Sequence, residues 1–472
     1  MTPSLWVTLE KFGQQAIWLI LFAILAPILG PKPYGLFAIV MVFIGFCEFV
    51  TVEAAAEALI GMEPLEPDHL RTATTLNVGV SIAAGVAVFL LAPVFGQVFD
   101  DAELAPLFQG LAVLPAISAL RAAPTAILKR RMDFRPLAVR SIVSLAVGGV
   151  AGVVLALTGA GAWALVGQIL LQRVVEVVIM WSSAGSSAGV GWSNRHFLDL
   201  RGYAANVFLS RSMMFLGGQL PRIIIGYGLG PVALGIFTLA SRFPETLAQV
   251  VLAPRVIVAR VELRQFRAGD EGLVRASRRM MRDIALIACP MSLGAAATIP
   301  VLFSVWLDAR WQAGILASQL MLLTIPPLVV FYASTSILLA LNFPADEAKT
   351  SAAQSVTNAL FTLAGVPFGL DALCLLLTVR VFLLLPYPMF LLARTCGIPG
   401  RVIADAITLP FVMSLVMGGA VLWISPFLVT RFGGPMALAA LCVAGIAVYA
   451  LMVGVFARKD VHLIFSRQPQ LP

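Results

Sequence analysis

The chain has 472 residues, of which 60% are hydrophobic and only 12% charged, and its mean hydropathy is +0.95. A soluble protein of this length needs far more charge to cover its surface, so the composition excludes a soluble globular fold. The formal net charge of +8 does not indicate a nucleic-acid partner, because the placement of the basic residues around apolar segments explains it.

Apolar runs long enough to cross a hydrocarbon core recur from end to end. We therefore predict an all-α polytopic membrane protein with about fourteen transmembrane helices. In chain order, the predicted spans cover residues 12–30, 34–56, 73–98, 105–125, 136–157, 162–183, 202–226, 232–256, 283–307, 313–341, 351–369, 372–393, 402–429 and 435–456. The first is predicted to be a retained helix and not a cleaved signal peptide, because it follows Glu10 and Lys11 and leads directly into another span.

The basic residues predict the orientation of these spans. With the N-terminus in the cytoplasm, most lysines and arginines fall on the cytoplasmic side, as the positive-inside rule requires. They concentrate after the spans 105–125 and 232–256, at Lys129, Arg130, Arg131, Arg135, Arg264, Arg267, Arg275, Arg278, Arg279 and Arg282. The opposite loops hold only Lys32, Arg310 and Arg431. We therefore expect both termini to be cytoplasmic and the basic loops to lie near anionic lipid.

The chain also contains an internal repeat. Leu29-Gly30-Pro31 followed by Gly35-Leu36-Phe37 recurs two hundred positions later as Leu229-Gly230-Pro231 followed by Gly235-Ile236-Phe237. Pro93-Val94 and Val98-Phe99 recur as Pro300-Val301 and Val305-Trp306, two hundred and seven positions later. The repeat predicts two pseudo-symmetric six-helix lobes, residues 1–190 and 191–397, followed by two C-terminal helices and a tail in residues 398–472. Because each lobe has an even number of helices, both enter the membrane in the same orientation, and a cleft is expected between them.

Several segments resemble one transporter family. They are the opening LGPKPYGLFAIVMVF, HLRTATTLN before the third span, LKRRMDFRPLAVRS after the fourth, and the central LGPVALGIFTLASRFPETL with the following PRVIVARVELRQFRAGDEGLVRASRRMMR. Over nearly the whole chain they resemble the polysaccharide transporter (PST) family, the Wzx-type flippases of the multidrug/oligosaccharidyl-lipid/polysaccharide (MOP) superfamily. Pro27 is a departure, since members usually carry an arginine there, just before the Leu-Gly-Pro turn.

The resemblance implies two six-helix bundles around a central cavity, in a bacterial inner membrane. It implies a flippase that moves an undecaprenyl-diphosphate-linked oligosaccharide to the periplasmic leaflet by alternating access, for exopolysaccharide, O-antigen or capsule synthesis. The implied partners are this lipid-linked oligosaccharide, membrane lipids, and a polysaccharide polymerase with a chain-length regulator; no nucleic acid is expected. Such a protein is not an enzyme and needs no cofactor, and the chain has no Walker A sequence for ATP hydrolysis.

Arginines within the predicted spans are the candidate substrate-binding residues: Arg173, Arg211, Arg222, Arg242 and Arg380. Each costs about 2.5–3.5 kcal/mol at a helix centre, so such side chains normally face the interior of a bundle. Guanidinium groups bind phosphate oxygens bidentately, which suits a diphosphate headgroup. We therefore predict that the cleft is cationic.

Spacing and the repeat relate these cations to one another. Arg211 and Arg222 lie on one stripe of a helix, about 16 Å apart along its axis. At the two offsets of the repeat, Arg211 corresponds to Lys11 and Arg173 corresponds to Arg380. Lys11 is therefore a further candidate, and the corresponding cations are expected to face each other across the cleft.

Structural explanations are available for several of these residues. Arg242 with Glu245, and Arg173 with Glu176, are i, i+3 pairs that can neutralise each other on one helix.

Other polar residues in the spans have two explanations each. Lys11 can be a flanking anchor, and Arg222 can extend to the periplasmic surface. Glu48 lies deep enough to carry a proton or a coupling cation. Gln14 and Gln15 can hydrogen-bond sugar hydroxyls or join helices.

No metal site is expected, because His69, His196 and His462 fall in loops or the tail and the five cysteines lack metal-binding spacing. The main alternative function is a MATE-like, ion-coupled antiporter of small molecules. A basic cleft argues against it, because cationic drugs prefer acidic or aromatic cavities. A polymerase or ligase is disfavoured by the short outward loops, and a major-facilitator transporter by GMEPLEPDHLR in place of its charged loop.

Overall fold

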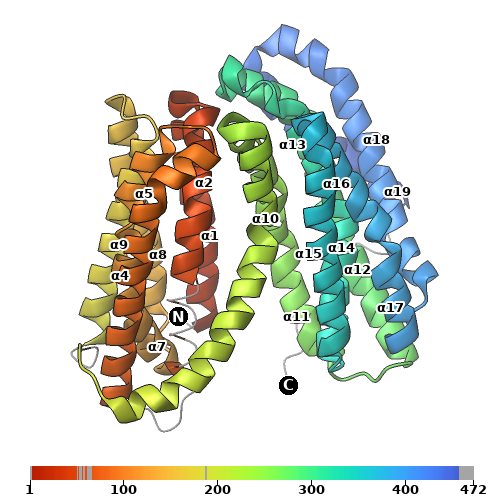
Figure 1. Cartoon of the computed structure of the whole chain (residues 1–472). Helices are drawn as coiled ribbons and strands as arrows, with labels where there is room; N and C mark the ends of the chain where they lie inside the picture. Colours follow the sequence, from red (N-terminus) through yellow and green to blue (C-terminus); the bar gives the residue numbers. More distant parts are fainter. Residues whose placement is uncertain are drawn as a thin grey trace. The chain divides into compact units, whose positions relative to one another are not determined.

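The computed structural model describes residues 3–49, 52, 56, 59–60, 66–185 and 189–456. Within these residues the chain forms helices joined by short turns, and no strand is present. The chain divides into two compact units, Met1–Gly235 and Ile236–Pro472 (Figure 1). This boundary falls inside a helix, whereas the sequence predicts a boundary at residue 190; the division into residues 1–190, 191–397 and 398–472 stays a prediction.

The first unit is a bundle of long helices with three short ones. Its helices are α1 (Pro3–Leu29), α2 (Pro31–Glu48), α4 (Pro67–Val98), α5 (Leu104–Leu111), α6 (Leu114–Ala119), α7 (Ala122–Arg130), α8 (Arg135–Leu157), α9 (Trp163–Ala184) and the first part of α10 (Asn194–Leu247). α8 packs along α9, and α1 packs on α8. On another side of the bundle, α4 packs against α5 and α6.

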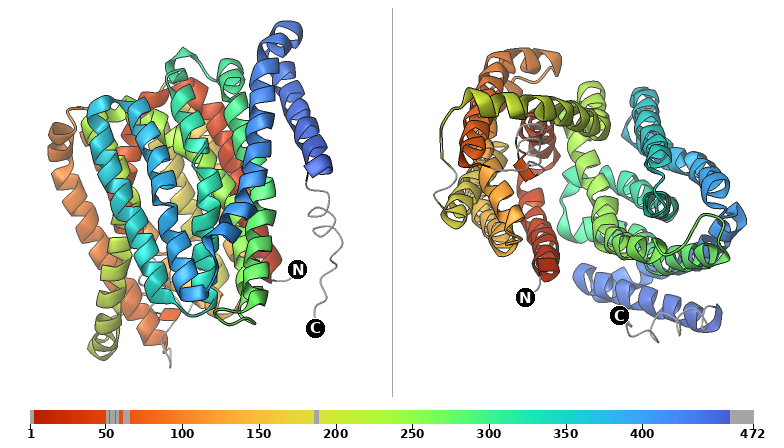
Figure 2. Two further views of the ribbon diagram at one scale, coloured as in Figure 1. Left: turned by 90° about the vertical axis from the view of Figure 1, so that its right-hand side faces the viewer. Right: turned by 90° about the horizontal axis from the view of Figure 1, so that it is seen from below.

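The second unit continues from the end of α10. It contains π-helical η2 (Ala248–Leu252), α11 (Ala253–Leu263), α12 (Glu271–Trp306), η3 (Ala309–Trp311), α13 (Gly314–Leu322), α14 (Ile325–Ala340), α15 (Pro344–Gly365), η4 (Val366–Phe368), α16 (Leu370–Leu384), α17 (Pro386–Cys396), α18 (Gly400–Phe432) and α19 (Gly434–Phe456). α12 packs along α18, and α18 along α19. Figure 2 shows α18 and α19, in blue, at the edge of this unit. One core cluster joins η2, α12, α14 and α17 through the fully buried Leu252, Met281, Ile325 and Leu392.

The helices confirm the polytopic fold. In the described part of the chain, eleven helices are long and apolar enough to cross a membrane, and α13 with α14, which meet at 41°, can form a twelfth as a broken span. The predicted span 351–369 overlaps α15, which carries Asp346, Glu347 and Lys349 in its first two turns and is not among the helices long and apolar enough to cross a membrane. The all-α membrane class is therefore confirmed, and the count of fourteen stays a prediction.

Two predicted spans are built differently from a single straight helix. Residues 105–125 form three short helices, α5 to α7, with Pro115 in the first turn of α6. The predicted spans 202–226 and 232–256 are joined without a loop, through a break at Gly230 inside α10.

The internal repeat is visible in the backbone. Gly30 has φ 76° and ψ 179°, and Gly230 has φ 81° and ψ 176°, a conformation open to glycine. The second glycine of each copy lies against the other copy: a Cβ on Gly35 would lie 1.6 Å from the Pro231 carbonyl oxygen, and a Cβ on Gly235 would lie 2.0 Å from that of Pro31. The repeated segments therefore pack backbone to backbone in a reciprocal contact.

Candidate functional site

The interior of the first unit holds an ionic network around Glu48 and Arg173. Glu48 is the last residue of α2, and its side chain is buried. Arg173, on α9, donates from Nε to Glu48 Oε1 over 3.0 Å and from Nη2 to Oε2 over 3.3 Å. Ser118, near the end of α6, donates to the same carboxylate. One guanidinium fork thus holds both oxygens of Glu48 and connects α2 to α9.

A second carboxylate, Glu176, shares Arg173 and brings in Arg121. Glu176 lies one turn after Arg173 on α9 and accepts from its Nη1 over 3.1 Å. Arg121, the residue between α6 and α7, donates to Glu176 Oε2 over 2.5 Å and lies 3.9 Å from Glu48. Gln172 donates to Glu176 over 3.2 Å. The break between α6 and α7 therefore places a third helical segment on the same cluster of charges.

A smaller pair lies where α1 meets α8. Arg140 on α8 lies 3.7 Å from Glu10 on α1, and Ser141 donates to the same carboxylate oxygen over 2.5 Å. This pair joins α1 to the side of the bundle that carries the main network.

Charges in these contacts balance. The cations are Arg121, Arg140 and Arg173, and the anions are Glu10, Glu48 and Glu176. None of the six side chains is more than 21% exposed, so removing one partner would leave a charge without compensation, at roughly 3–5 kcal/mol. For Arg173 the geometry favours the structural explanation, an ion pair with Glu176, over direct substrate binding. Glu48, predicted for ion coupling, is held by the same contacts.

Arg380 in the second unit has a different environment. It lies on α16, half-buried, and its Nη1 donates to the Gln354 carbonyl oxygen over 2.9 Å and to Thr357 Oγ1 over 3.4 Å, both on α15. Its Nε is buried without a hydrogen-bond partner among the described residues. Within the same residues, no carboxylate lies within 4.0 Å of it. Arg380 is therefore a partly buried cation whose charge those residues do not neutralise.

The arginines of α10 have polar neighbours on their own helix. Arg242 Nη1 lies 3.5 Å from Glu245 Oε2, so the predicted i, i+3 pair is present, and both side chains are more than a third exposed. Arg222 donates to Gln219 over 2.8 Å and is half-buried.

The other predicted residues stay separate from these clusters. On α1, Lys11 is exposed and Gln14 and Gln15 are half-buried. The side chain of Arg211 lies outside the described residues, although its backbone belongs to α10. The structure thus does not bring the predicted candidates together as one described site, and their substrate-binding role stays a prediction.

Sequence reasoning missed part of the network. Arg121 and Arg140 lie inside the predicted spans 105–125 and 136–157, and their position alone could have identified them. Glu10 lies just before the first predicted span, and its position in the sequence gives no sign of its pairing with Arg140.

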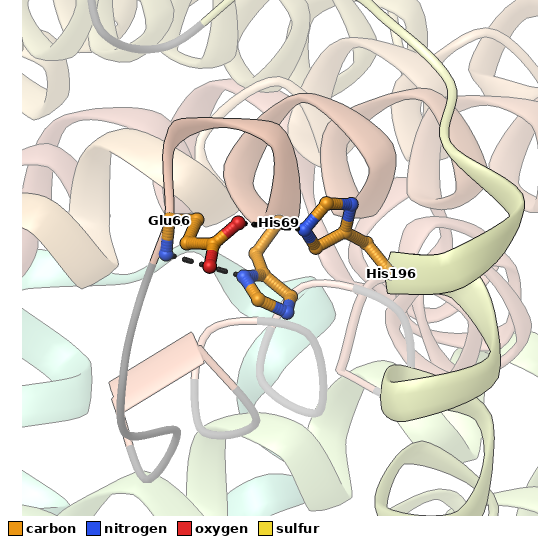
Figure 3. A group of neighbouring side chains, drawn as sticks. All are labelled: Glu66, His69 and His196. Carbon is orange, nitrogen blue, oxygen red and sulfur yellow. Dashed lines mark hydrogen bonds and ion pairs between the residues drawn. The ribbon is translucent and has the colours of Figure 1, made fainter.

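Two of the histidines lie elsewhere than the sequence predicts. His69 and His196 lie together with Glu66, and one ligand atom of each residue lies within 4.8 Å of the others, an arrangement that could hold a metal ion (Figure 3). The sequence places these two histidines in loops, whereas the structure has them in the first turns of α4 and α10, which meet in space. The expectation of no metal site stays a prediction.

Helices in two compact units, with charged residues inside the membrane-spanning bundle, define a polytopic membrane protein of the kind found among transporters. Solved structures share this fold. The lipid II flippase MurJ in an inward closed conformation matches 96% of this chain and 99% of its own, with a TM-score of 0.78 at 12% identity. An inward-facing multidrug resistance MATE family transporter of the MOP superfamily matches 86% of this chain and 99% of its own, with a TM-score of 0.58 at 14% identity.

A family model described as polysaccharide biosynthesis protein matches residues 24–316, more than half of the chain. The chain therefore belongs to this family. The succinoglycan biosynthesis transport protein ExoT of Rhizobium meliloti is 25% identical over 52% of this chain and 50% of its own length. The teichuronic acid biosynthesis protein TuaB of Bacillus subtilis is 23% identical over 67% of this chain and 66% of its own. The chain thus spans about half to two thirds of the length of these two relatives.

Proposed function

We propose that this protein is a flippase that moves a lipid-linked oligosaccharide, such as an undecaprenyl-diphosphate-linked repeat unit, across the inner membrane for surface polysaccharide synthesis. Alternating access between its two predicted six-helix lobes carries the substrate from the cytoplasmic to the periplasmic leaflet, with both termini cytoplasmic. A polysaccharide polymerase and a chain-length regulator receive and control the product.

The observation that carries this proposal is the family match over residues 24–316. The names of the relatives ExoT and TuaB refer to the biosynthesis of succinoglycan and of teichuronic acid. The likeness to MurJ supports a fold that can carry a lipid-linked sugar, since MurJ is called a lipid II flippase.

The charge of Arg380 adds chemical support. A cation at the centre of a membrane-spanning helix costs about 2.5–3.5 kcal/mol on insertion, a cost that an apolar residue does not have. Arg380 is therefore expected to do more than fill space between helices. Its Nη1 is engaged by α15, while its Nε has no described partner. A diphosphate oxygen would accept a charge-assisted hydrogen bond from such a group. We propose Arg380 as the first phosphate contact of the second unit, with Arg211, Arg222 and Arg242 as further contacts.

A MATE-like antiporter of small molecules is the second candidate, supported by the MATE structure with a TM-score of 0.58. The two functions require opposite site charges, because an organic cation needs acidic or aromatic groups and a diphosphate needs cations. No carboxylate neutralises Arg380 among the described residues, and such a positive charge suits a diphosphate better than an organic cation. The charge of Arg380 therefore favours the flippase.

The test is restoration of surface polysaccharide in a strain that lacks this gene. The variants are Arg380→Gln and Arg380→Lys, and the matched control is Arg431→Gln, which removes an exposed arginine near the end of α18. Membrane levels are equalised by immunoblot. We expect Arg380→Gln to lower polysaccharide output at least tenfold, Arg380→Lys to retain part of it, and Arg431→Gln to match the wild type.

Two results would contradict the proposal. Full activity of Arg380→Gln would remove Arg380 from the phosphate site. A strain that recovers efflux of cationic dyes and no polysaccharide would favour the antiporter.

A further inference from the structure

Three side chains converge where α4 and α10 begin in the first unit. Glu66 caps the N-terminus of α4, and His69 lies in the first turn of that helix. His196 lies in the first turn of α10, and both histidines are buried. Figure 3 shows the carboxylate of Glu66 beside the two imidazoles, with a dashed line to His196. The rings meet edge to face, with centroids 4.2 Å apart and planes at 84°.

Two hydrogen-bond contacts set the orientation of the His196 ring. Its Nδ1 lies 2.7 Å from Ser193 Oγ, and its Nε2 lies 3.0 Å from Glu66 Oε2. In a metal complex, Nδ1 would carry the proton and donate it to Ser193, and the lone pair of Nε2 would then be available to an ion held between this nitrogen and the carboxylate. A metal-binding histidine is usually oriented in this way, by an outer partner that accepts its other N–H group.

His69 is the second imidazole at the same place. Its Nδ1 accepts a hydrogen bond from the Glu66 backbone N–H over 3.1 Å, and an ion bound through this nitrogen would take the place of that N–H group. The Glu66 carboxylate is the third group of the cluster, with its Oε2 3.0 Å from Nε2 of His196. Two imidazoles and one carboxylate therefore lie close enough, with one ligand atom of each within 4.8 Å of the others, to hold one cation once these hydrogen bonds are exchanged for bonds to the ion.

We propose that Glu66, His69 and His196 form a binding site for a divalent transition metal ion of the zinc class. Two imidazoles and a carboxylate are ligands that Zn²⁺ accepts, with water in the fourth tetrahedral position. Bonds of about 2.0–2.2 Å would replace the hydrogen bond between His196 Nε2 and the Glu66 carboxylate and draw the ligand atoms, now within 4.8 Å of one another, closer together.

Among the described residues, Arg195 brings a positive charge close to Glu66. Arg195 is exposed and acts on Glu66 through its positive charge. Solvent screens such a charge, so it weakens the site without preventing binding.

The metal would strengthen a junction that already exists. Thr75 of α4 donates to the Gly191 carbonyl oxygen over 2.8 Å, and Thr72 accepts from the Ser193 backbone N–H over 3.2 Å. The segment that leads into α10 is thus fastened along the first turns of α4. A bound ion would lock the first residues of α10 to α4, independently of what the protein transports.

The experiment uses the full chain purified in detergent, with any affinity tag removed and metal stripped by a chelator. Zn²⁺ binding is measured by calorimetry, and Co²⁺ is used as a visible probe of tetrahedral geometry. We expect about one Zn²⁺ per chain and a raised Tm on its addition. His196→Gln should abolish binding and the Co²⁺ absorption band.

Ser193→Ala is the graded variant. It leaves all three ligands in place and removes only the group that orients His196, so we expect about a tenfold to hundredfold loss of Zn²⁺ affinity. His462→Gln, which removes the histidine outside the described residues, is the matched control and should bind as the wild type does.

The proposal is overturned if Zn²⁺ does not raise the Tm of the wild-type protein. The cluster would then be a hydrogen-bonded junction between helices and nothing more. The proposal is equally overturned if His196→Gln and His69→Gln retain wild-type Zn²⁺ affinity. A folded state of each variant is confirmed by its elution as a single species in size-exclusion chromatography.

Discussion

The reciprocal contact of the repeat makes Gly35 and Gly235 the most informative positions to perturb. A Cβ on Gly35 would lie 1.6 Å from the Pro231 carbonyl oxygen and 2.5 Å from its carbonyl carbon. A Cβ on Gly235 would lie 2.0 and 2.8 Å from the same two atoms of Pro31. Both obstacles are backbone atoms, so no side-chain rotation can relieve the overlap.

The cost can be estimated from these distances. Real Cβ atoms essentially never approach closer than 3.0 Å, so either alanine would push the two helices apart by about 1 Å or more. Overpacking of this kind costs typically about 1–3 kcal/mol, and an unyielding backbone places each alanine near the upper end. For a unit of this size that corresponds to a Tm lower by roughly 5–10 °C.

The two substitutions should not add. Once Gly35→Ala has separated the helices, the second alanine meets a gap that is already open, so the double variant should lose clearly less than the sum of the single losses. Gly218→Ala is the control, because its Cβ would meet no atom within 4 Å, and alanine is the better helix former.

Thermal stability of the detergent-purified variants, followed by size-exclusion fluorescence, provides the measurement. We expect both single variants to unfold well below the wild type, and Gly218→Ala to unfold at or slightly above the wild-type Tm. Wild-type Tm values for Gly35→Ala and Gly235→Ala would refute the close contact. Strictly additive losses would refute a shared interface.

Two further predictions compare a buried with an exposed ion pair. In both, the change in stability is measured as the change in Tm of the detergent-purified variant. Arg173→Gln leaves Glu48 and Glu176 short of a partner and should cost roughly 3–5 kcal/mol, and a milder loss than about 1 kcal/mol would contradict the buried network. Lys32→Met removes an exposed lysine that bonds Glu103 over 2.7 Å, and it should change stability by less than about 1 kcal/mol, with any larger loss counting against this distinction.

Sequence reasoning recovers what depends on local pattern. Hydrophobic length predicts helices such as α8 and α9, and the repeated Leu-Gly-Pro segment predicts the turns at Gly30 and Gly230, because these features are set by neighbouring residues. The pairing of Arg173 with Glu176 could also be predicted, since three residues on one helix fix it.

Contacts between distant helices are what the sequence leaves open. The bond from Arg173 to Glu48 crosses 125 positions, and that from His196 to Glu66 crosses 130. Such pairs depend on which helices pack together, and apolar helices can pack against one another in several arrangements. The sequence alone therefore does not select the partner. The division of 105–125 into three helices is a related case, because the break that positions Arg121 is set by tertiary contacts.

The repeat explains why the corresponding arginines of the two units differ. Arg173 on α9 corresponds to Arg380 on α16, but the carboxylates that neutralise Arg173 have apolar counterparts: Ala248 stands two hundred positions after Glu48, and Leu383 stands two hundred and seven after Glu176. A cation that joins helices in the first unit is thus left without these two partners in the second. This difference supports Arg380, and not Arg173, as the phosphate contact.

Leu383→Glu tests that argument by restoring a partner. It places a carboxylate at i+3 from Arg380, the spacing at which Glu176 bonds Arg173 over 3.1 Å. Leu383→Gln has the same shape without the charge and controls for the loss of an apolar side chain. If phosphate recognition depends on the uncompensated charge of Arg380, Leu383→Glu should lower polysaccharide output at least tenfold below Leu383→Gln at equal membrane levels. Equal output of the two variants would mean that the charge of Arg380 is not what the substrate contacts.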